Sequence, residues 1–245
     1  MSMFVRLLLE RALCFRFGGL VASIPTTIYF FDTFVFVSPG QSSAKLYLFG
    51  IVFLFSVLIA ALLPFMGYEG LSTRASAERL MASGGAQEYV ASVFLTSFVL
   101  SLVAGFIVVL NGISLLSLEF RLVHAAIACC AVALGAAGAC AVVHVIAFSS
   151  GIRGRLAPAV VLFVLAGLSG WYFDMRMWNG QGLEFGPFLG TLKLASFPHW
   201  VRTVVIDSLT GDTARATSLY IAALTGLGVV GYSVLRGEYF LRGTK

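Results

Sequence analysis

The chain has 245 residues, of which 59% are apolar and only 11% are charged, and its mean hydropathy is +0.97. A soluble domain of this length needs far more polar surface, so these values exclude a water-soluble globular protein and predict that lipid surrounds most of the chain. The formal net charge is +5, but no basic run is interleaved with aromatic residues, which argues against nucleic-acid binding.

The first 17 residues form an amphipathic segment. Phe4, Leu7 and Leu8 fall near one helix face, and Arg6 and Glu10 form an i, i+4 pair on another. The segment is too short and too charged to cross a bilayer. We expect residues 1–17 to be a helix lying in the inner membrane interface. The alternative is that they extend the first span continuously into the cytoplasm.

Six stretches are long and apolar enough to cross a bilayer, which takes about 20 residues. Backbone groups in hydrocarbon must be hydrogen-bonded internally, so each stretch is predicted to be an α-helix. The first is too long for a cleaved signal peptide and is expected to stay as an uncleaved anchor. The chain is therefore read as a single transmembrane domain, 1–245, with spans at Gly18–Val37, Leu46–Met66, Tyr89–Leu110, Leu122–Phe148, Ala157–Phe173 and Ala216–Leu235.

A short charged segment, residues 67–88, separates the second and third spans. Its central part, 72–82, contains good helix formers, and Gly84 and Gly85 then end the helix. Glu88 opens the third span, where a negative charge suits a helix N-terminus. The apolar side chains in this segment need a surface to cover. We therefore predict a cytoplasmic helix that contacts a soluble partner, with an ordinary solvated loop as the alternative.

The connection at 174–215 is too long for a turn and too apolar for a solvated loop. Its first half is interrupted by glycines and by Pro187, and it is too short to cross the membrane. Pro198 stands at a favourable helix start. Trp200, Val201 and Val204 then follow at helical spacing. We predict a re-entrant hairpin or short helices half buried in the outer leaflet; the alternative is a loop that covers the outer ends of the spans.

Basic residues predict the orientation, since they gather on the cytoplasmic side of short connections. With both termini in the cytoplasm, ten basic residues lie inside and six outside. The inside set is Arg6, Arg11, Arg16, Arg74, Arg79, Arg153, Arg155, Arg236, Arg242 and Lys245. The outside set is Lys45, Arg121, Arg176, Lys193, Arg202 and Arg215.

Motifs of catalysis and nucleotide binding are missing from the sequence. None of the three lysines follows a glycine, so the chain has no P-loop. Asp32 is the one carboxylate candidate within a span, and its place near the outer end favours a solvated or capping role over a functional one. Cys140 and His144 share a helix face and could form half of a metal site, but packing between alanine-rich helices is the favoured interpretation.

The order of these segments resembles the membrane subunit of the ABC type-2 permease family. The likeness covers essentially the whole chain: an amphipathic N-terminus, two spans, a cytoplasmic charged helix, three spans, a re-entrant outer segment and a last span with a basic tail. The sequence from Arg74 to Ser83 is similar to the family's cytoplasmic motif, with Ala75 in place of Gly and Ser76 in place of Thr. The stretch from Ser196 to Gly211 resembles its outer-helix segment, and Leu235–Arg242 resembles its tail.

The resemblance implies a permease that binds no cofactor itself and pairs with a second copy or a homologous permease. Two separate ATP-binding subunits with a P-loop would drive it, in what we expect to be a bacterial cytoplasmic membrane. It also implies an ATPase-coupling helix and an outer gate. The coupling residues would be Arg74, Ser76, Glu78, Arg79, Leu80 and Met81, and the gate residues Pro198, Trp200 and Arg202.

Two other functions compete with the exporter. A secondary transporter predicts carboxylates at mid-membrane for a coupling ion, and these are missing. A membrane scaffold or immunity protein predicts that an ATPase partner is dispensable. The spans offer few polar groups for a sugar or an ion, so the expected cargo is hydrophobic or amphipathic, moved outward or between leaflets.

Overall fold

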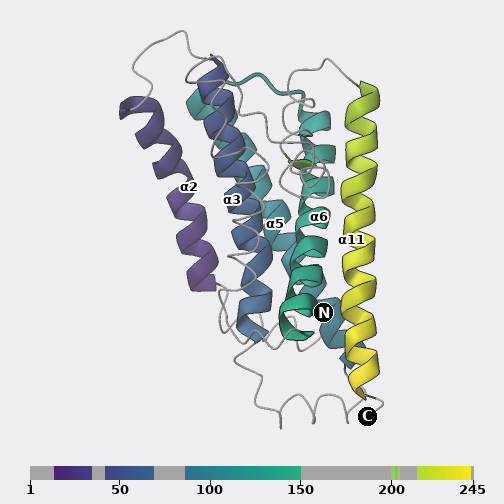
Figure 1. Ribbon diagram of the computed structural model, residues 1–245. Helices are drawn as coiled ribbons and strands as arrows, with labels where there is room; N and C mark the ends of the chain where they lie inside the picture. The colour runs from purple at the N-terminus through teal and green to yellow at the C-terminus, as the bar shows by residue number, and fades with distance from the viewer. Residues whose placement is uncertain are drawn as a thin grey trace, which may run out of the picture.

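Five helices make up nearly all of the described structure. The computed structural model describes residues 14–34, 42–68, 86–149, 200–201, 204 and 214–243. Within these ranges the chain is helical apart from the connection at 117–121. The helices are α2 (Cys14–Phe34), α3 (Ser42–Tyr68), α5 (Ala86–Leu116), α6 (Leu122–Ser149) and α11 (Ala214–Gly243), and Figure 1 shows them side by side in one bundle.

Four of the helices are long and apolar enough to cross a membrane. They contain the windows Leu48–Phe65, Val90–Leu116, Leu122–Ile146 and Ser218–Gly237, which match the second, third, fourth and sixth predicted spans. The prediction of an all-α integral membrane protein is therefore confirmed in its coarse form. The predicted fifth span, 157–173, lies outside the described residues.

The first predicted span is helical but does not join this group of four. As α2 it has Ser23, Thr26, Thr27 and Asp32 among its apolar residues. The three hydroxyl groups are exposed, and each donates a hydrogen bond to a backbone carbonyl three or four residues earlier. These polar groups, with Arg16 and Asp32, keep α2 outside the group of helices that are apolar enough to cross a membrane. Of the α2 side chains that the structure describes, Ile24 and Ile28 are the buried ones.

The first four helices, α2, α3, α5 and α6, run in alternating directions, and α11 then runs in the same direction as α6. α2 and α5 run towards the end of the bundle drawn at the top of Figure 1, whereas α3, α6 and α11 run away from it. α6 and α11 are consequently parallel neighbours. Because α6 ends at one side of the bundle and α11 begins at the other, residues 150–213 connect opposite ends.

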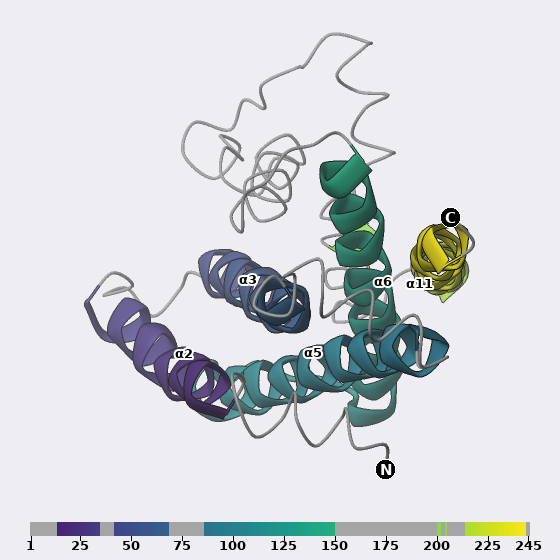
Figure 2. The same ribbon diagram turned by 90° about the horizontal axis from the view of Figure 1, so that it is seen from below.

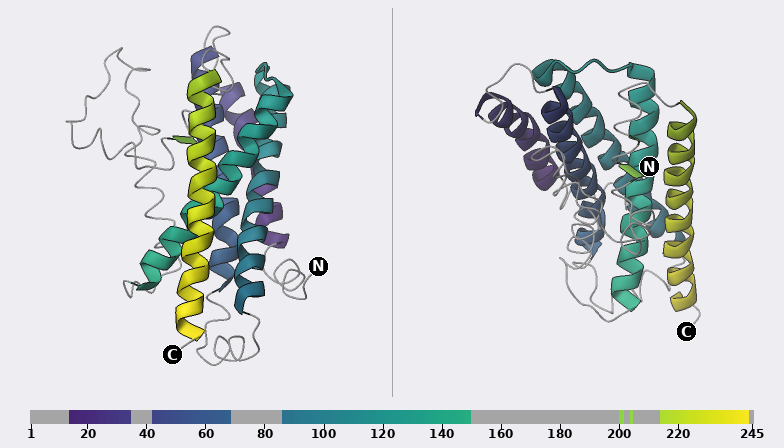
Figure 3. Two further views of the ribbon diagram at one scale, coloured as in Figure 1. Left: turned by 90° about the vertical axis from the view of Figure 1, so that its right-hand side faces the viewer. Right: turned by 45° about the horizontal axis from the view of Figure 1, so that its top comes forward.

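The centre of the bundle is α3. Within its membrane window 83% of residues are buried, against 22% for the window of α11, so α11 is a peripheral helix. Seen from below, α3 lies between α2, α5 and α6, and α11 stands on the far side of α6 (Figure 2). The left view of Figure 3 shows α6 crossing behind α11, and in the right view the two helices stand side by side.

One face of α5 is apolar and exposed. Large side chains recur along it at helical spacing and are between 37% and 59% exposed: Leu95, Val99, Val103, Phe106 and Leu110. A continuous apolar stripe of this kind is unfavourable in water and suits contact with lipid tails. The buried polar residues of α5 occupy its other side, so this helix separates lipid from the interior.

The ends of α5 show why it begins and stops where it does. Glu88 lies in its first turn, as predicted for a negative charge at a helix N-terminus. At the other end Ser117 adopts a left-handed conformation, φ 54°, and the Leu118 amide donates to the Gly112 carbonyl at 3.2 Å. This turn reverses the chain. The Arg121 carbonyl then accepts the first bond of α6, from the Ala125 amide.

Three helices extend past the predicted span boundaries. α2 begins at Cys14, so residues 14–17 are continuous with the first span, as in the alternative prediction of a continuous extension. α3 continues to Tyr68 and α5 starts at Ala86, so the predicted segment 67–88 is helical at both of its ends. Residues 1–13 and 69–85 lie outside the described residues.

Candidate functional site

Of the three predicted gate residues, the structure describes Trp200. Its ring lies 5.1 Å from the ring of Tyr220 on α11, measured between centroids, and the planes meet at 70°. This edge-to-face geometry is favourable for aromatic pairs. Trp200 therefore links the segment before α11 to the first turns of α11. Pro198 and Arg202 lie outside the described residues.

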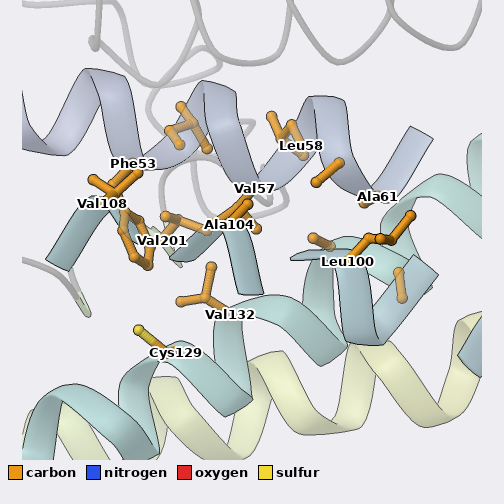
Figure 4. Close-up of a cluster of buried hydrophobic side chains, with 14 of the residues drawn as sticks. Phe53, Val57, Leu58, Ala61, Leu100, Ala104, Val108, Cys129, Val132 and Val201 are labelled. Atoms are coloured by element: carbon orange, nitrogen blue, oxygen red, sulfur yellow. The ribbon is translucent and has the colours of Figure 1, made fainter. Parts of the chain in front are cut away.

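The neighbours of Trp200 are enclosed by protein. Val201 and Val204 are both 0% exposed, and the predicted depth of this segment in the outer leaflet stays a prediction. Figure 4 shows Val201 in the same cluster as Phe53 of α3, Val108 of α5 and Val132 of α6. The spacing of Trp200, Val201 and Val204 already indicated a helical turn. Its insertion between three other helices could not be read from the sequence.

The predicted coupling residues, Arg74, Ser76, Glu78, Arg79, Leu80 and Met81, lie outside the described residues. The structure does describe the two helices that flank them. α3 ends and α5 begins at the same end of the bundle, which is also the end where α6 and α11 finish (Figure 1). Residues 69–85 therefore join two antiparallel helices of the core at this end.

Buried hydroxyl groups join α3 and α5, and these contacts were not among the predictions from the sequence. The Ser97 hydroxyl of α5 donates to the Ala61 carbonyl of α3 at 2.8 Å. The Ser101 hydroxyl contacts the Val57 carbonyl at 3.2 Å and the Ser97 carbonyl at 2.7 Å. Both serines are 0% exposed. Polar residues in an apolar helix commonly bond to a neighbouring helix, but Ser92 and Thr96 have the same i, i+4 spacing and bond to their own helix.

A second pair of helices is joined by glycines. A Cβ atom on Gly138 of α6 would meet the Leu227 carbonyl and lie 2.6 Å from the Gly228 Cα of α11. A Cβ atom on Gly231 would overlap the Gly138 Cα, and one on Gly228 would lie 2.9 Å from the Leu134 carbonyl. No side chain larger than hydrogen fits at these three positions without displacement. The backbones of α6 and α11 are therefore in direct contact, as small residues permit between membrane helices.

Asp32 has a partner at the end of the bundle. Its Oδ1 atom lies 3.1 Å from Lys45 Nζ, and the two side chains are 27% and 28% exposed. The pair ties the last turns of α2 to the first turn of α3. This contact agrees with the predicted structural role near a membrane surface and gives no support to a buried functional carboxylate.

Cys140 and His144 lie on the side of α6 that contacts other helices. Cys140 is 0% exposed, and the His144 ring, which is partly buried, lies 5.4 Å from the Phe65 ring of α3. Among the described residues no group of three or more histidine, cysteine or acidic side chains could hold a metal ion. These contacts are compatible with the packing role favoured from the sequence, which stays a prediction.

The described basic residues do not by themselves orient the bundle. Arg16, Arg236 and Arg242 lie at one end; Lys45, Arg121 and Arg215 lie at the other. The ten-to-six asymmetry in the sequence therefore comes from residues outside the described ranges, and the orientation stays a prediction.

Comparison of the chain with protein-family models, with curated proteins and with solved structures finds no match. The relation to ABC type-2 permeases thus stays a resemblance, based on the order of segments and on the short motifs quoted above. The physical features of the bundle carry the functional argument.

Proposed function

We propose that the chain is the membrane subunit of an ATP-driven exporter, similar to the ABC type-2 permeases, and that a separate P-loop ATPase drives it. Four apolar helices and the lipid-facing stripe of α5 support a membrane location. The sequence has no phosphate-binding loop, so the energy source must be another subunit or an ion gradient. A second permease chain would complete the pathway.

One observation carries the proposal. The charged segment 69–85 joins the ends of α3 and α5, and α3 is the most buried membrane helix of the bundle. A force applied to this segment acts on the centre of the bundle through two helices at once. A rigid element docked on an ATPase can transmit nucleotide-driven closure in this way.

In this proposal the two ends of the bundle have different tasks. Arg74, Ser76, Glu78, Arg79, Leu80 and Met81 contact the ATPase. Trp200, with Pro198 and Arg202, would form the outer gate through which the cargo leaves. The orientation is that of the sequence prediction, with both termini in the cytoplasm. The cargo is hydrophobic or amphipathic, because the buried polar groups of α5 bond to backbone carbonyls and offer little to a polar substrate.

Co-purification tests the proposal. The tagged full-length chain is extracted gently in detergent, and its partners are identified by mass spectrometry. We expect an ATPase with a P-loop at a fixed ratio to the permease. A chain that transports while reproducibly free of such a partner would overturn the proposal in favour of a secondary transporter. A partner-free chain without transport would favour a scaffold or immunity role.

A further inference from the structure

We propose that the bundle consists of two rigid pairs, α3 with α5 and α6 with α11, which shift against each other across an apolar seam. This inference deepens the proposed function and rests on it for the source of the force. The division into pairs comes from the described contacts alone, so it can be tested in the chain without any partner.

The first pair is fixed by directional bonds. The Ser97 hydroxyl donates to the Ala61 carbonyl of α3 at 2.8 Å. The Ser101 hydroxyl has one proton and lies closer to the Ser97 carbonyl of its own helix, at 2.7 Å, than to the Val57 carbonyl of α3, at 3.2 Å. The Ser97 bond, with the close approach of Ser101 one turn away, sets the register of the two helices. Because residues 69–85 join the same two helices, a force on that segment moves α3 and α5 as one lever.

The second pair is fixed by shape. Gly138 fits against Gly228 and Gly231 so closely that the backbones touch. Sliding α6 along α11 would bring these backbones into collision with the groups that flank the glycines, of which the Leu134 side chain and the Leu227 carbonyl are the nearest. Close-packed contacts of this kind have discrete arrangements and do not deform continuously.

The seam between the pairs consists of side-chain contacts. A Cβ atom on Gly105 of α5 would lie 3.6 Å from the Cys129 Sγ of α6, and 3.5 Å from side-chain atoms of Phe53 and Val57 of α3. Ala104 and Val108 of α5 and Val132 of α6 belong to the same cluster (Figure 4). Two ring contacts also cross the seam: Phe65–His144 between α3 and α6 at 5.4 Å, and Phe94–Tyr232 between α5 and α11 at 5.3 Å. Side chains can change rotamer, whereas the backbone contact at Gly138 cannot adjust in that way. Small shear movements of packed helices suit such a surface.

The position of the connection at 117–121 sets where movement is largest. It ties α5 to α6 at one end of the bundle. The opposite ends of these helices are free of that tie, and the segment 69–85 leads into α5 there. Relative displacement of the two pairs is therefore greatest at the end where the proposed ATPase would bind.

Spin-label distances test the division into two pairs. The full-length chain is used, with its four cysteines replaced by alanine, and it is reconstituted in lipid nanodiscs. Label pairs at Ile59 and Leu95 report on α3–α5, and pairs at Ile146 and Val234 report on α6–α11. A pair at Leu95 and Val234 spans the seam. We expect narrow distributions within each pair and a distribution across the seam that is broader by at least the order of 1–2 Å of a helix shift.

Matched variants separate the proposed bonds from general destabilisation. Ser97→Ala with Ser101→Ala should broaden the α3–α5 distribution. Ser92→Ala with Thr96→Ala is the control, because those two hydroxyl groups donate to carbonyls of their own helix. Ser97→Thr keeps a hydroxyl group and should restore the narrow distribution. Gly231→Ala should broaden α6–α11, whereas Gly226→Ala, which points into open space, should not.

Equal widths for all three label pairs would overturn the proposal. So would a serine double variant that behaves like its control. The proposed function fails separately, through the absence of an ATPase in the co-purification, and that result leaves the distances in the isolated chain unchanged.

Discussion

A Cβ atom on Gly231 of α11 would overlap the Cα and the carbonyl of Gly138 on α6. The two helices consequently meet through backbone atoms. Substitution at this contact must separate the helices, while Gly226, five residues earlier on α11, has open space around it. The pair of sites offers a matched test of the packing.

Gly231→Leu is expected to lower the free energy of unfolding by about 1–3 kcal/mol or more, the usual cost of overpacking a filled interior. Gly226→Leu places the same side chain on an open face and should change the stability little. Thermal unfolding of both variants in the same detergent is the measurement. Equal losses at the two positions would contradict the close contact between α6 and α11.

The Asp32–Lys45 ion pair is expected to contribute modestly to stability. The side chains are partly exposed, and such pairs contribute about 0–1 kcal/mol. A double-mutant cycle with Asp32→Asn and Lys45→Met should give a coupling energy in that range, and it should fall at high salt. A coupling of several kcal/mol that salt leaves unchanged would mean that the pair is buried away from solvent.

Exchanging the charges at the predicted coupling helix is expected to weaken the complex with the ATPase. Glu78→Arg with Arg79→Glu leaves interfacial hydrogen bonds unpaired, which costs roughly 2–5 kcal/mol. Complex formation and ATP hydrolysis are measured in one lipid. Trp200→Ala is the companion variant: it removes the contact with Tyr220 at the other end of the bundle and should alter cargo exit while sparing assembly. Dissociation by Trp200→Ala alone, with the charge exchange silent, would refute the assignment.

The orientation is expected to place residues 67–88 and 149–156 inside, and 38–45, 111–121 and 174–215 outside. Single cysteines at position 76 and at position 119, in a cysteine-free background, are treated with an impermeant thiol reagent on intact cells. Position 119 lies in the connection between α5 and α6 and should react; position 76 should react only after the membrane is opened. The reverse labelling pattern would mean that the bundle has the opposite orientation in the membrane.

Apolar runs predicted α3, α5, α6 and α11 closely, because hydrocarbon permits few backbone structures other than a helix. The ends of the helices were predicted less closely, because helical hydrogen bonding continues past the apolar stretch: α3 includes Ser42 and α11 extends to Gly243. α2 contains Ser23, Thr26, Thr27 and Asp32 among its apolar residues, and it is not among the four helices that are apolar enough to cross a membrane.

The contacts between helices could not be predicted in the same way. Serines and glycines are frequent along the chain, and nothing in the sequence distinguishes Ser97, which bonds to α3, from Thr96, which bonds to its own helix. Likewise Gly226 and Gly231 look alike until α6 is placed beside α11. Which small or polar residue meets a partner depends on helix rotation and crossing, which local patterns do not determine.

The parallel arrangement of α6 and α11 also has a consequence for biosynthesis. The α3–α5 helical hairpin can form early, because its two helices are close together in the chain. The contact at Gly138 forms much later, because its partner, Gly231, is translated only after residues 150–213. Until α11 is made, α6 lacks the backbone contact that Gly228 and Gly231 supply. Packing of the last helix therefore completes the described bundle.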